Sequence, residues 1–206
     1  MPYLSRLSGC AVLAAALLPL CIPAQSTVVG TPAPAFTVAD SQGKTETLTR
    51  YRGSYVVLEW TNQGCPYTKK HYVSGNMQAL QKEWTAKGVI WLTVISSAPG
   101  LQGYETPSQE NAYLTQVHAA PTAVLMDPEG KLGHLYNAKT TPEMFVINPE
   151  GKLIYEGAID DRPTVEVGDV QGAHNYVSAA LTESMAGKPV TMPYTRSYGC
   201  SVKYSH

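Results

Sequence analysis

Cys65 is the residue of this chain whose type and position point most directly to chemistry. It follows an apolar, strand-like stretch at residues 55–58 and stands directly before Pro66 and a helix-like pattern. At such a strand-to-helix junction, free backbone N–H groups and the positive end of the helix dipole favour a thiolate over a thiol. Pro66 suits the first helical position, where its missing N–H costs no hydrogen bond. The pattern predicts a nucleophilic cysteine, against the alternative of a buried, inert thiol.

Three basic residues, Lys69, Lys70 and His71, fall within the first two turns of the expected helix. Positive charge near a thiol lowers its pKa. Helical geometry places the three side chains on different faces, so we expect one or two of them close to the sulfur and at least one lysine in solvent.

The residues around Cys65 supply further candidates for the site. We expect Trp60 and Tyr67 to line the site. The alternative for Trp60 is that it belongs to the hydrophobic core. Thr68 is a candidate donor of a hydrogen bond to the sulfur. Glu59 ends an apolar strand; it is either a buried carboxylate that moves protons or an outward-facing edge residue.

The rest of the chain alternates between apolar strand-like runs and helical patterns, then ends in a hairpin and a helix. We expect strands at 36–38, 45–48, 55–60, 89–95, 122–126, 143–147 and 153–156, and helices at 66–87, 108–118, 131–138 and 170–185. Gly75 marks a break in the first of these helices. Ser108 is the candidate N-cap of the second. This order predicts an α/β fold with a mixed sheet flanked by helices.

Residues 1–26 read as a signal peptide for export. Arg6 precedes an apolar run at residues 11–20, which small residues follow, and the run is shorter than a bilayer-spanning helix requires. We therefore expect a periplasmic or extracellular protein with no stable membrane span. The remaining chain divides into a domain at 27–186 and a C-terminal tail at 187–206. A net charge of -1 and the lack of basic blocks argue against a nucleic-acid partner.

Several segments together resemble the thioredoxin-like superfamily, and within it the peroxiredoxin-like branch of the alkyl hydroperoxide reductase/thiol-specific antioxidant type. The segment 30–36 is similar to the start of that domain, and Gly64-Cys65-Pro66-Tyr67 to its reactive-cysteine turn. Thr141-Pro142, before an apolar strand, is similar to the cis-proline loop of thioredoxin folds. The resemblance implies a thioredoxin-like fold in which Thr141 and Pro142 shape the substrate groove beside the sulfur.

Three features depart from the patterns of these families. Thr68 occupies the position of the second cysteine in thioredoxins, so a local disulfide is impossible. Asn62 stands where peroxiredoxins have a threonine, and residues 141–145 lack their peroxide-binding arginine. The family likeness favours peroxide reduction, whereas these departures favour thiol–disulfide exchange.

Cys200 is then the internal candidate for a second redox thiol. It lies on the tail beside Gly199, and exported proteins meet an oxidising compartment. Three alternatives stay open: a catalytic Cys65–Cys200 disulfide, a permanent structural one, or two thiols that never meet.

These observations predict an exported thiol-dependent oxidoreductase with Cys65 as nucleophile and Cys200 as resolving thiol. Its partners would be a peroxide or a protein disulfide, and an external thiol reductant. Because sulfur itself carries the electrons, no cofactor and no metal are expected. The competing class is a non-enzymatic thioredoxin-fold binding protein for a metal or a partner chain, with a structural Cys65–Cys200 disulfide.

Overall fold

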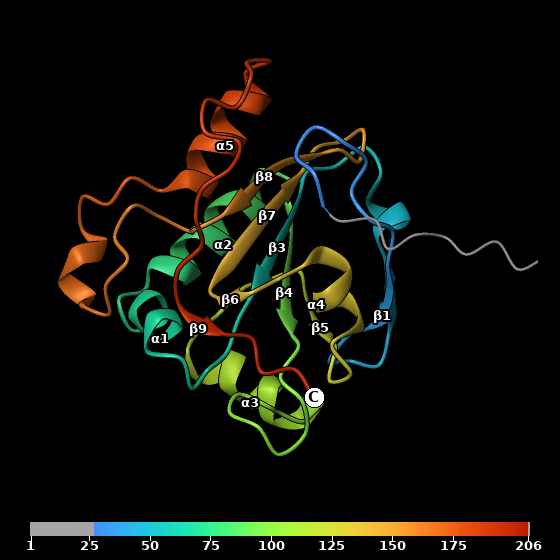
Figure 1. Cartoon of the computed structure of the whole chain (residues 1–206), viewed down its shortest axis with the longest axis vertical. Coiled ribbons are helices and arrows are strands. Elements are labelled where there is room, and N and C mark those ends of the chain that lie inside the picture. The colour runs from blue at the N-terminus through green and yellow to red at the C-terminus, as the bar shows by residue number, and fades with distance from the viewer. Residues whose placement is uncertain (1–26, 206) are drawn as a thin grey trace, which may run out of the picture.

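A five-stranded mixed sheet forms the centre of the molecule (Figure 1). The computed structural model describes residues 27–205. The strand order is β5-β4-β3-β7-β8, with β3 parallel to β4 and antiparallel to β7. The strands span β3 Val56–Trp60, β4 Ile90–Ile95, β5 Ala123–Met126, β7 Glu143–Ile147 and β8 Leu153–Gly157. This confirms the expected α/β fold with a mixed sheet and the hairpin made by β7 and β8.

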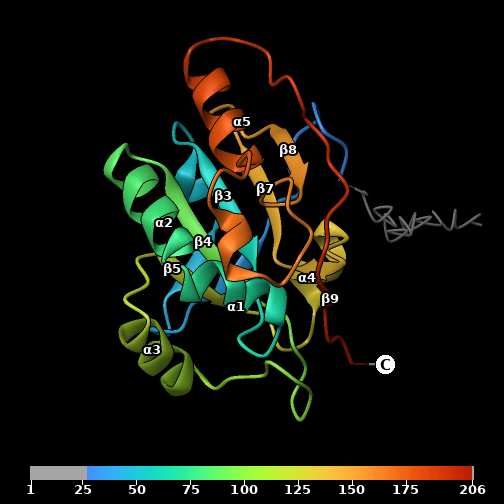
Figure 2. The same cartoon turned by 90° about the vertical axis from the view of Figure 1, so that its left-hand side faces the viewer.

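The central strand β3 is buried on both faces, and its side chains alternate between two hydrophobic clusters. Figure 2 shows helices on both sides of the sheet. One cluster packs against α1 (Pro66–Val73), α2 (Asn76–Ala86) and α5 (Tyr176–Met185). The other packs against α4 (Lys131–Tyr136). Covering both faces explains why the central strands are apolar nearly throughout.

An antiparallel pair, β1 (Thr37–Ala39) with β2 (Thr45–Thr47), precedes a short 3-10 helix, η1 (Leu48–Tyr51). The pair lies beside α4 and β5 (Figure 1). Its residues agree with the two short strands expected from the sequence.

All four expected helices have different bounds in the structure, and the one expected at 131–138 ends at Tyr136 as α4. The span 66–87 forms two helices, because Gly75 adopts a left-handed conformation with φ of 77° between α1 and α2. Helix α3 (Pro107–Gln116) is capped by Thr106 through a capping box with Gln109, so the expected cap at Ser108 is wrong. The last helix begins only after its cap at Asn175, and a separate 3-10 helix, η2 (Val167–Val170), precedes it.

The C-terminal tail returns along the outer edge of β8 and then crosses the end of the sheet near α1 (Figure 1). Residues Tyr194 and Glu156 form a parallel bridge at that edge. Beyond it, β9 (Cys200–Ser201) pairs antiparallel with β6 (Thr140–Thr141). The tail therefore brings Cys200 back to the centre of the molecule.

The expected signal peptide, residues 1–26, lies outside the described residues, and the boundaries 27–186 and 187–206 stay predictions. Within residues 27–205, none of the helices combines the length and apolar character that a membrane crossing requires.

Candidate functional site

A tight turn after β3 places Cys65 at the start of α1. The Asn62 side chain accepts a hydrogen bond from the Gly64 N–H (2.8 Å), and the Cys65 N–H donates to the Asn62 carbonyl (3.0 Å). The Asn62 amide also donates to the Gln102 carbonyl (3.1 Å), which ties the turn to the loop after β4. Cys65 is the N-cap of α1 and Pro66 its first residue, as the sequence predicts. The sulfur therefore stands at a helix N-terminus on a braced turn.

The cis-proline loop faces this sulfur. The Thr141–Pro142 peptide bond is cis, in agreement with the family resemblance. The Cys65 thiol donates a hydrogen bond to the Thr141 carbonyl at 3.0 Å. Cys65 and Thr141 are 0% and 1% exposed, so this contact is closed to bulk solvent.

Strand pairing brings the second cysteine to the same point. In the β6–β9 ladder Thr141 stands opposite Cys200, and Thr140 opposite Ser201. Gly199 has φ of 136°, and a Cβ there would meet the Thr141 carbonyl oxygen at 2.0 Å. Only glycine permits this close approach. Both cysteines are free thiols in the structure, and their side chains contact each other without a bond between them.

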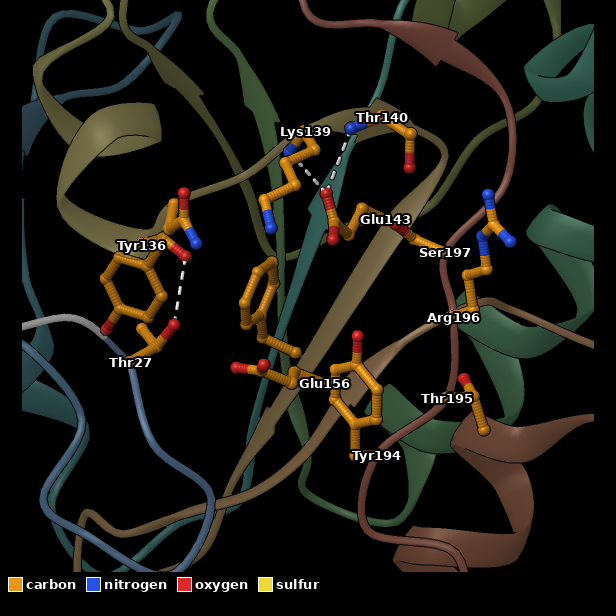
Figure 3. Close-up of a pocket in the computed structure, with 12 residues that line it drawn as sticks. Thr27, Tyr136, Lys139, Thr140, Glu143, Glu156, Tyr194, Thr195, Arg196 and Ser197 are labelled. Carbon is orange, nitrogen blue, oxygen red and sulfur yellow. Dashed lines mark hydrogen bonds between the residues drawn. The ribbon is translucent and has the colours of Figure 1, made fainter.

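Glu143 fixes the backbone that leads into the cis-proline loop. Its carboxylate accepts hydrogen bonds from the backbone N–H groups of Lys139 (2.6 Å) and Thr140 (3.0 Å), as Figure 3 shows. Burial raises the pKa of Glu143, while these two N–H groups and Ser197 of the tail lower it. Glu143 also lines a cavity of 580 Å³. Figure 3 shows the tail residues from Tyr194 to Ser197 forming one wall of this cavity. Glu143 thus joins the loop to the tail.

The two thiols differ in acidity. Burial opposes ionisation of Cys65, but hydrogen bonds from the Cys200 side chain and the Thr68 backbone N–H outweigh it and lower the pKa of Cys65. Burial raises the pKa of Cys200 to about 11, together with its hydrogen bond to Cys65 and the charge of Cys65. Cys65 is therefore the thiol that ionises first.

The other predicted site residues occupy distinct places. Tyr67 packs its ring 5.9 Å from that of the tail residue Tyr198. Trp60 is fully buried in the core against Tyr136 and Phe145, which is the alternative considered for it. The Thr68 backbone contacts the sulfur.

Two residues whose backbones contact the Cys65 sulfur carry buried hydroxyls that have no hydrogen-bond partner in the described structure. These hydroxyls belong to Thr68 and Thr141, which are 0% and 1% exposed. Because an unpaired buried hydroxyl is costly, native proteins keep few of them. The Thr141 side chain is among the groups that lower the pKa of Cys65, so its hydroxyl is placed to donate to a charged or oxygenated sulfur.

The basic residues of α1 do not act as the sequence suggested. Hydrogen bonds, and not these charges, are the main causes of the lowered Cys65 pKa. Lys69 is exposed, whereas the Lys70 ammonium donates to the Arg162 carbonyl at 2.6 Å. Burial lowers the pKa of His71 to about 4, so this ring is neutral at pH 7.

Glu59 is a buried carboxylate and not an outward-facing edge residue. It is 0% exposed and accepts hydrogen bonds from Trp91 (2.7 Å), Tyr72 (2.8 Å) and Gln81 (3.1 Å). Burial raises its pKa, and these donors oppose that effect. Its partners lie on α1, α2 and β4, so it ties the sheet to the helices that follow Cys65.

The described part of the chain contains no ready set of metal ligands. Within residues 27–205, no group of three or more His, Cys, Asp or Glu side chains has the arrangement to hold a metal ion.

A cavity of 730 Å³ lies beside the tail and is lined by Thr140, Asp160, Tyr198 and Gly199, among others. It gives solvent a route to the neighbours of Cys200.

Comparison with protein families decides the classification of this chain. Residues 29–156 match the model of the AhpC/TSA family, and this segment holds β3, the Cys65 turn and the cis-proline loop. The chain belongs to the AhpC/TSA family. No curated protein matches it.

Solved structures agree with the fold of this AhpC/TSA member. An uncharacterised conserved protein from Geobacillus kaustophilus has a TM-score of 0.73 and 23% identity, over 86% of this chain and 93% of its own. A hypothetical protein from Sinorhizobium meliloti 1021 has a TM-score of 0.72 and 23% identity, over 88% and 97%.

A third structure carries a functional description. A protein from Chlorobium tepidum, provisionally described as the thiol:disulfide interchange protein DsbE, has a TM-score of 0.55 and 26% identity, over 75% of this chain and 99% of its own. The fold is thus thioredoxin-like. Membership of the AhpC/TSA family, together with this structural similarity, supports thiol-based redox chemistry in general.

Sequence reasoning missed the structural roles of three residues around the site of this family member. Asn62 forms the turn, and an Asn two residues before a Gly is a recognisable signal for it. Tyr198 and Asp160 hydrogen-bond to each other at 2.5 Å. They are 38 positions apart, and no local pattern announces that contact.

Proposed function

We propose that this protein is a thiol–disulfide oxidoreductase in which Cys65 and Cys200 form a reversible dithiol/disulfide couple. The observation that carries the proposal is the β6–β9 pairing, which holds Cys200 opposite Thr141 while the Cys65 thiol bonds to the same residue. A thiol pair held this way needs no Cys-x-x-Cys motif, because the tail supplies the second sulfur.

The acidities assign the order of attack. The Cys65 thiolate attacks one sulfur of a substrate disulfide, the substrate S–S bond breaks, and one substrate sulfur leaves as a thiolate. Cys65 is then uncharged in a mixed disulfide, which removes the charge that helps raise the pKa of Cys200. Cys200 loses its proton, attacks the Cys65 sulfur and releases the second substrate thiolate. An external thiol reductant restores the two thiols.

Peroxide reduction is the second candidate, and two observations favour it. Cys65 is fully buried beneath the tail, which a small peroxide passes more easily than a protein does. The Thr141 hydroxyl, which acts on the Cys65 sulfur and has no other partner in the described structure, is suited to donate to an oxygen on the sulfur. The thiolate would displace an alcohol or water from the protonated peroxide and become a sulfenic acid, and Cys200 would condense with it, releasing water.

We propose export to the periplasm or exterior on the basis of residues 1–26, whose sequence has the pattern of a signal peptide. An oxidising compartment is where a reversible disulfide has a use. The non-enzymatic alternative requires the two cysteines to be locked together.

Redox titration of the full chain tests the main proposal. Incubation in glutathione buffers of graded potential, followed by alkylation and mass spectrometry, counts the free thiols at each potential. We expect a Cys65–Cys200 disulfide that forms and breaks as one two-electron couple, and Cys65→Ser and Cys200→Ser variants that form none. A bond that stays closed under mild reductant, or thiols that never pair, would reject the proposal.

Substrate class is decided by rate. Reduced protein is mixed either with hydrogen peroxide or with a small disulfide, and Trp fluorescence follows oxidation. Cys65-dependent oxidation by peroxide that is much faster than that of a free thiol assigns peroxide reduction. Fast reaction with the disulfide alone assigns exchange.

A further inference from the structure

A buried polar cluster joins the tail to the helix that follows Cys65. Tyr198 of the tail donates a hydrogen bond from its hydroxyl to Asp160 (2.5 Å), and the same hydroxyl lies 3.3 Å from His71 Nε2. His71 Nε2 is 4.0 Å from the second Asp160 oxygen. The Asn76 amide contacts the other ring nitrogen of His71 at 2.9 Å. The Tyr198 hydroxyl therefore sits between α1 and the loop after β8.

One face of α1 is devoted to this contact. Tyr67, Lys70 and His71 are spaced by three and four residues, which places them on the same side of the helix. The Tyr198 ring lies 5.9 Å from the Tyr67 ring, and the Lys70 ammonium lies 5.3 Å from the centre of the Tyr198 ring. All three side chains thus pack around one tail residue.

Burial makes this cluster dependent on its partners. Lys70, His71 and Asp160 are 1%, 0% and 2% exposed. A buried charge that loses its partner is strongly destabilised. Tyr198 supplies a hydroxyl to the Asp160 carboxylate and a ring face to the Lys70 ammonium. Holding Tyr198 in place therefore satisfies two buried charges at once.

The position of Tyr198 in the chain links this cluster to the redox site. It stands two residues before Cys200, and the intervening Gly199 lies against the Thr141 carbonyl. Other tail contacts reach β8 through Thr195 and the 138–139 segment through Val202 and Tyr204. The Tyr198 contacts join the tail to the body of α1, the helix that begins at the reactive cysteine.

We propose that Tyr198 is a positioning residue that anchors the tail to α1 and so holds Cys200 against Cys65. The inference rests on the proposed Cys65–Cys200 couple and adds the contact that determines how readily its disulfide forms. Loss of the anchor lets the tail leave the site. The effective concentration of Cys200 at Cys65 then falls, and the covered Cys65 becomes accessible.

The test compares Tyr198→Phe with Tyr194→Phe in the full chain. Tyr194 lies on the same tail but is 63% exposed, so it controls for the loss of a tyrosine hydroxyl. For Tyr198→Phe we expect the Cys65–Cys200 disulfide to be about tenfold less favoured in glutathione buffer, since a hydrogen bond to a carboxylate is lost. For a two-electron couple this raises the potential by about 30 mV. Tyr194→Phe should match the unmodified chain.

A second readout separates positioning from a general loss of stability. In a Cys200→Ser background, Tyr198→Phe should increase the rate at which iodoacetamide alkylates Cys65 about tenfold in native buffer. The urea transition should move to a lower midpoint but stay cooperative, so the extra alkylation comes from folded protein whose tail has left the site. Asp160→Asn weakens the same bond from the other side and should act in the same direction, which keeps the test possible if Tyr198→Phe folds poorly.

The outcomes of the two readouts are distinct. An unchanged disulfide equilibrium together with unchanged Cys65 alkylation in both Tyr198→Phe and Asp160→Asn would overturn the anchor. If the unmodified chain forms no Cys65–Cys200 disulfide, the proposed couple fails, and the alkylation rate alone still decides whether Tyr198 holds the tail over Cys65.

Discussion

The acidity of Cys65 depends on donors that contact it directly. The Cys200 side chain is the largest cause that lowers its pKa, ahead of the Thr68 backbone N–H, and both work against burial. Replacing Cys200 by Ala removes that donor, whereas Ser retains one. We therefore expect a higher Cys65 pKa in Cys200→Ala than in Cys200→Ser, measured by thiolate absorbance near 240 nm as a function of pH. Equal titration curves for the two variants would show that Cys200 does not set this acidity.

Thr68 illustrates a residue kept at a cost to stability. Its hydroxyl is buried without a partner, so Thr68→Val removes an unsatisfied group while keeping the shape of the side chain. We expect the variant to be more stable by about 1 kcal/mol in urea unfolding. We also expect slower oxidation of Cys65, because the oxidised sulfur loses a donor. The matched control is Thr49→Val, on the exposed surface, which should change neither quantity.

Among single residues, the sequence alone indicates the reactive cysteine but not its chemical environment. Cys65, Pro66 and the cis Thr141–Pro142 bond follow from local patterns and a family likeness. The role of the α1 charges does not. Lys70 and His71 turn toward the Asp160 region, because that carboxylate and the Arg162 carbonyl lie within reach only after folding.

At the scale of elements, β9 exists because one glycine permits it. A Cβ at position 199 would stand 2.0 Å from the Thr141 carbonyl oxygen, and its φ of 136° is strained for other residues. We expect Gly199→Ala to separate β9 from β6, expose Cys65 to alkylation and abolish the Cys65–Cys200 disulfide. Gly168→Ala is the control, since a Cβ there meets nothing within 4 Å. Retention of the disulfide in Gly199→Ala would contradict the need for this close approach.

Periodicity and composition predict the strands and most of the helices, because their signals are local. The bounds that differ depend on backbone details: Gly75 divides one expected helix into two, and Asn175 starts α5 later than apolar spacing suggests. The tail is different in kind. Its two-residue strand carries no pattern of its own, and its pairing with β6 joins segments about sixty residues apart, so only the folded chain reveals it.

For the molecule as a whole, two buried titratable groups act on stability in opposite directions with pH. His71 has its pKa lowered to about 4 by burial, so its contribution to stability is present above pH 6.5 and lost as the pH falls toward 4. Glu110 on α3 has its pKa raised to about 7 by burial, although Gln63 donates to it at 2.5 Å. Its contribution is present below pH 4.5 and lost as the pH rises through 7.

Other buried carboxyl groups with raised pKa values, Glu59 and Glu143 among them, also change the stability as the pH rises, so a variant is needed to isolate the contribution of Glu110. Glu110→Gln keeps the size of the side chain and removes its titration, while His71 is unchanged. We expect the free energy of unfolding of Glu110→Gln, relative to the unmodified chain, to rise by about 3 kcal/mol between pH 4 and pH 8.5. Urea unfolding at four pH values measures this difference, with the exposed Glu166→Gln as the control. Parallel stability profiles for Glu110→Gln and the unmodified chain would mean that Glu110 ionises in the folded protein as it does in the unfolded chain.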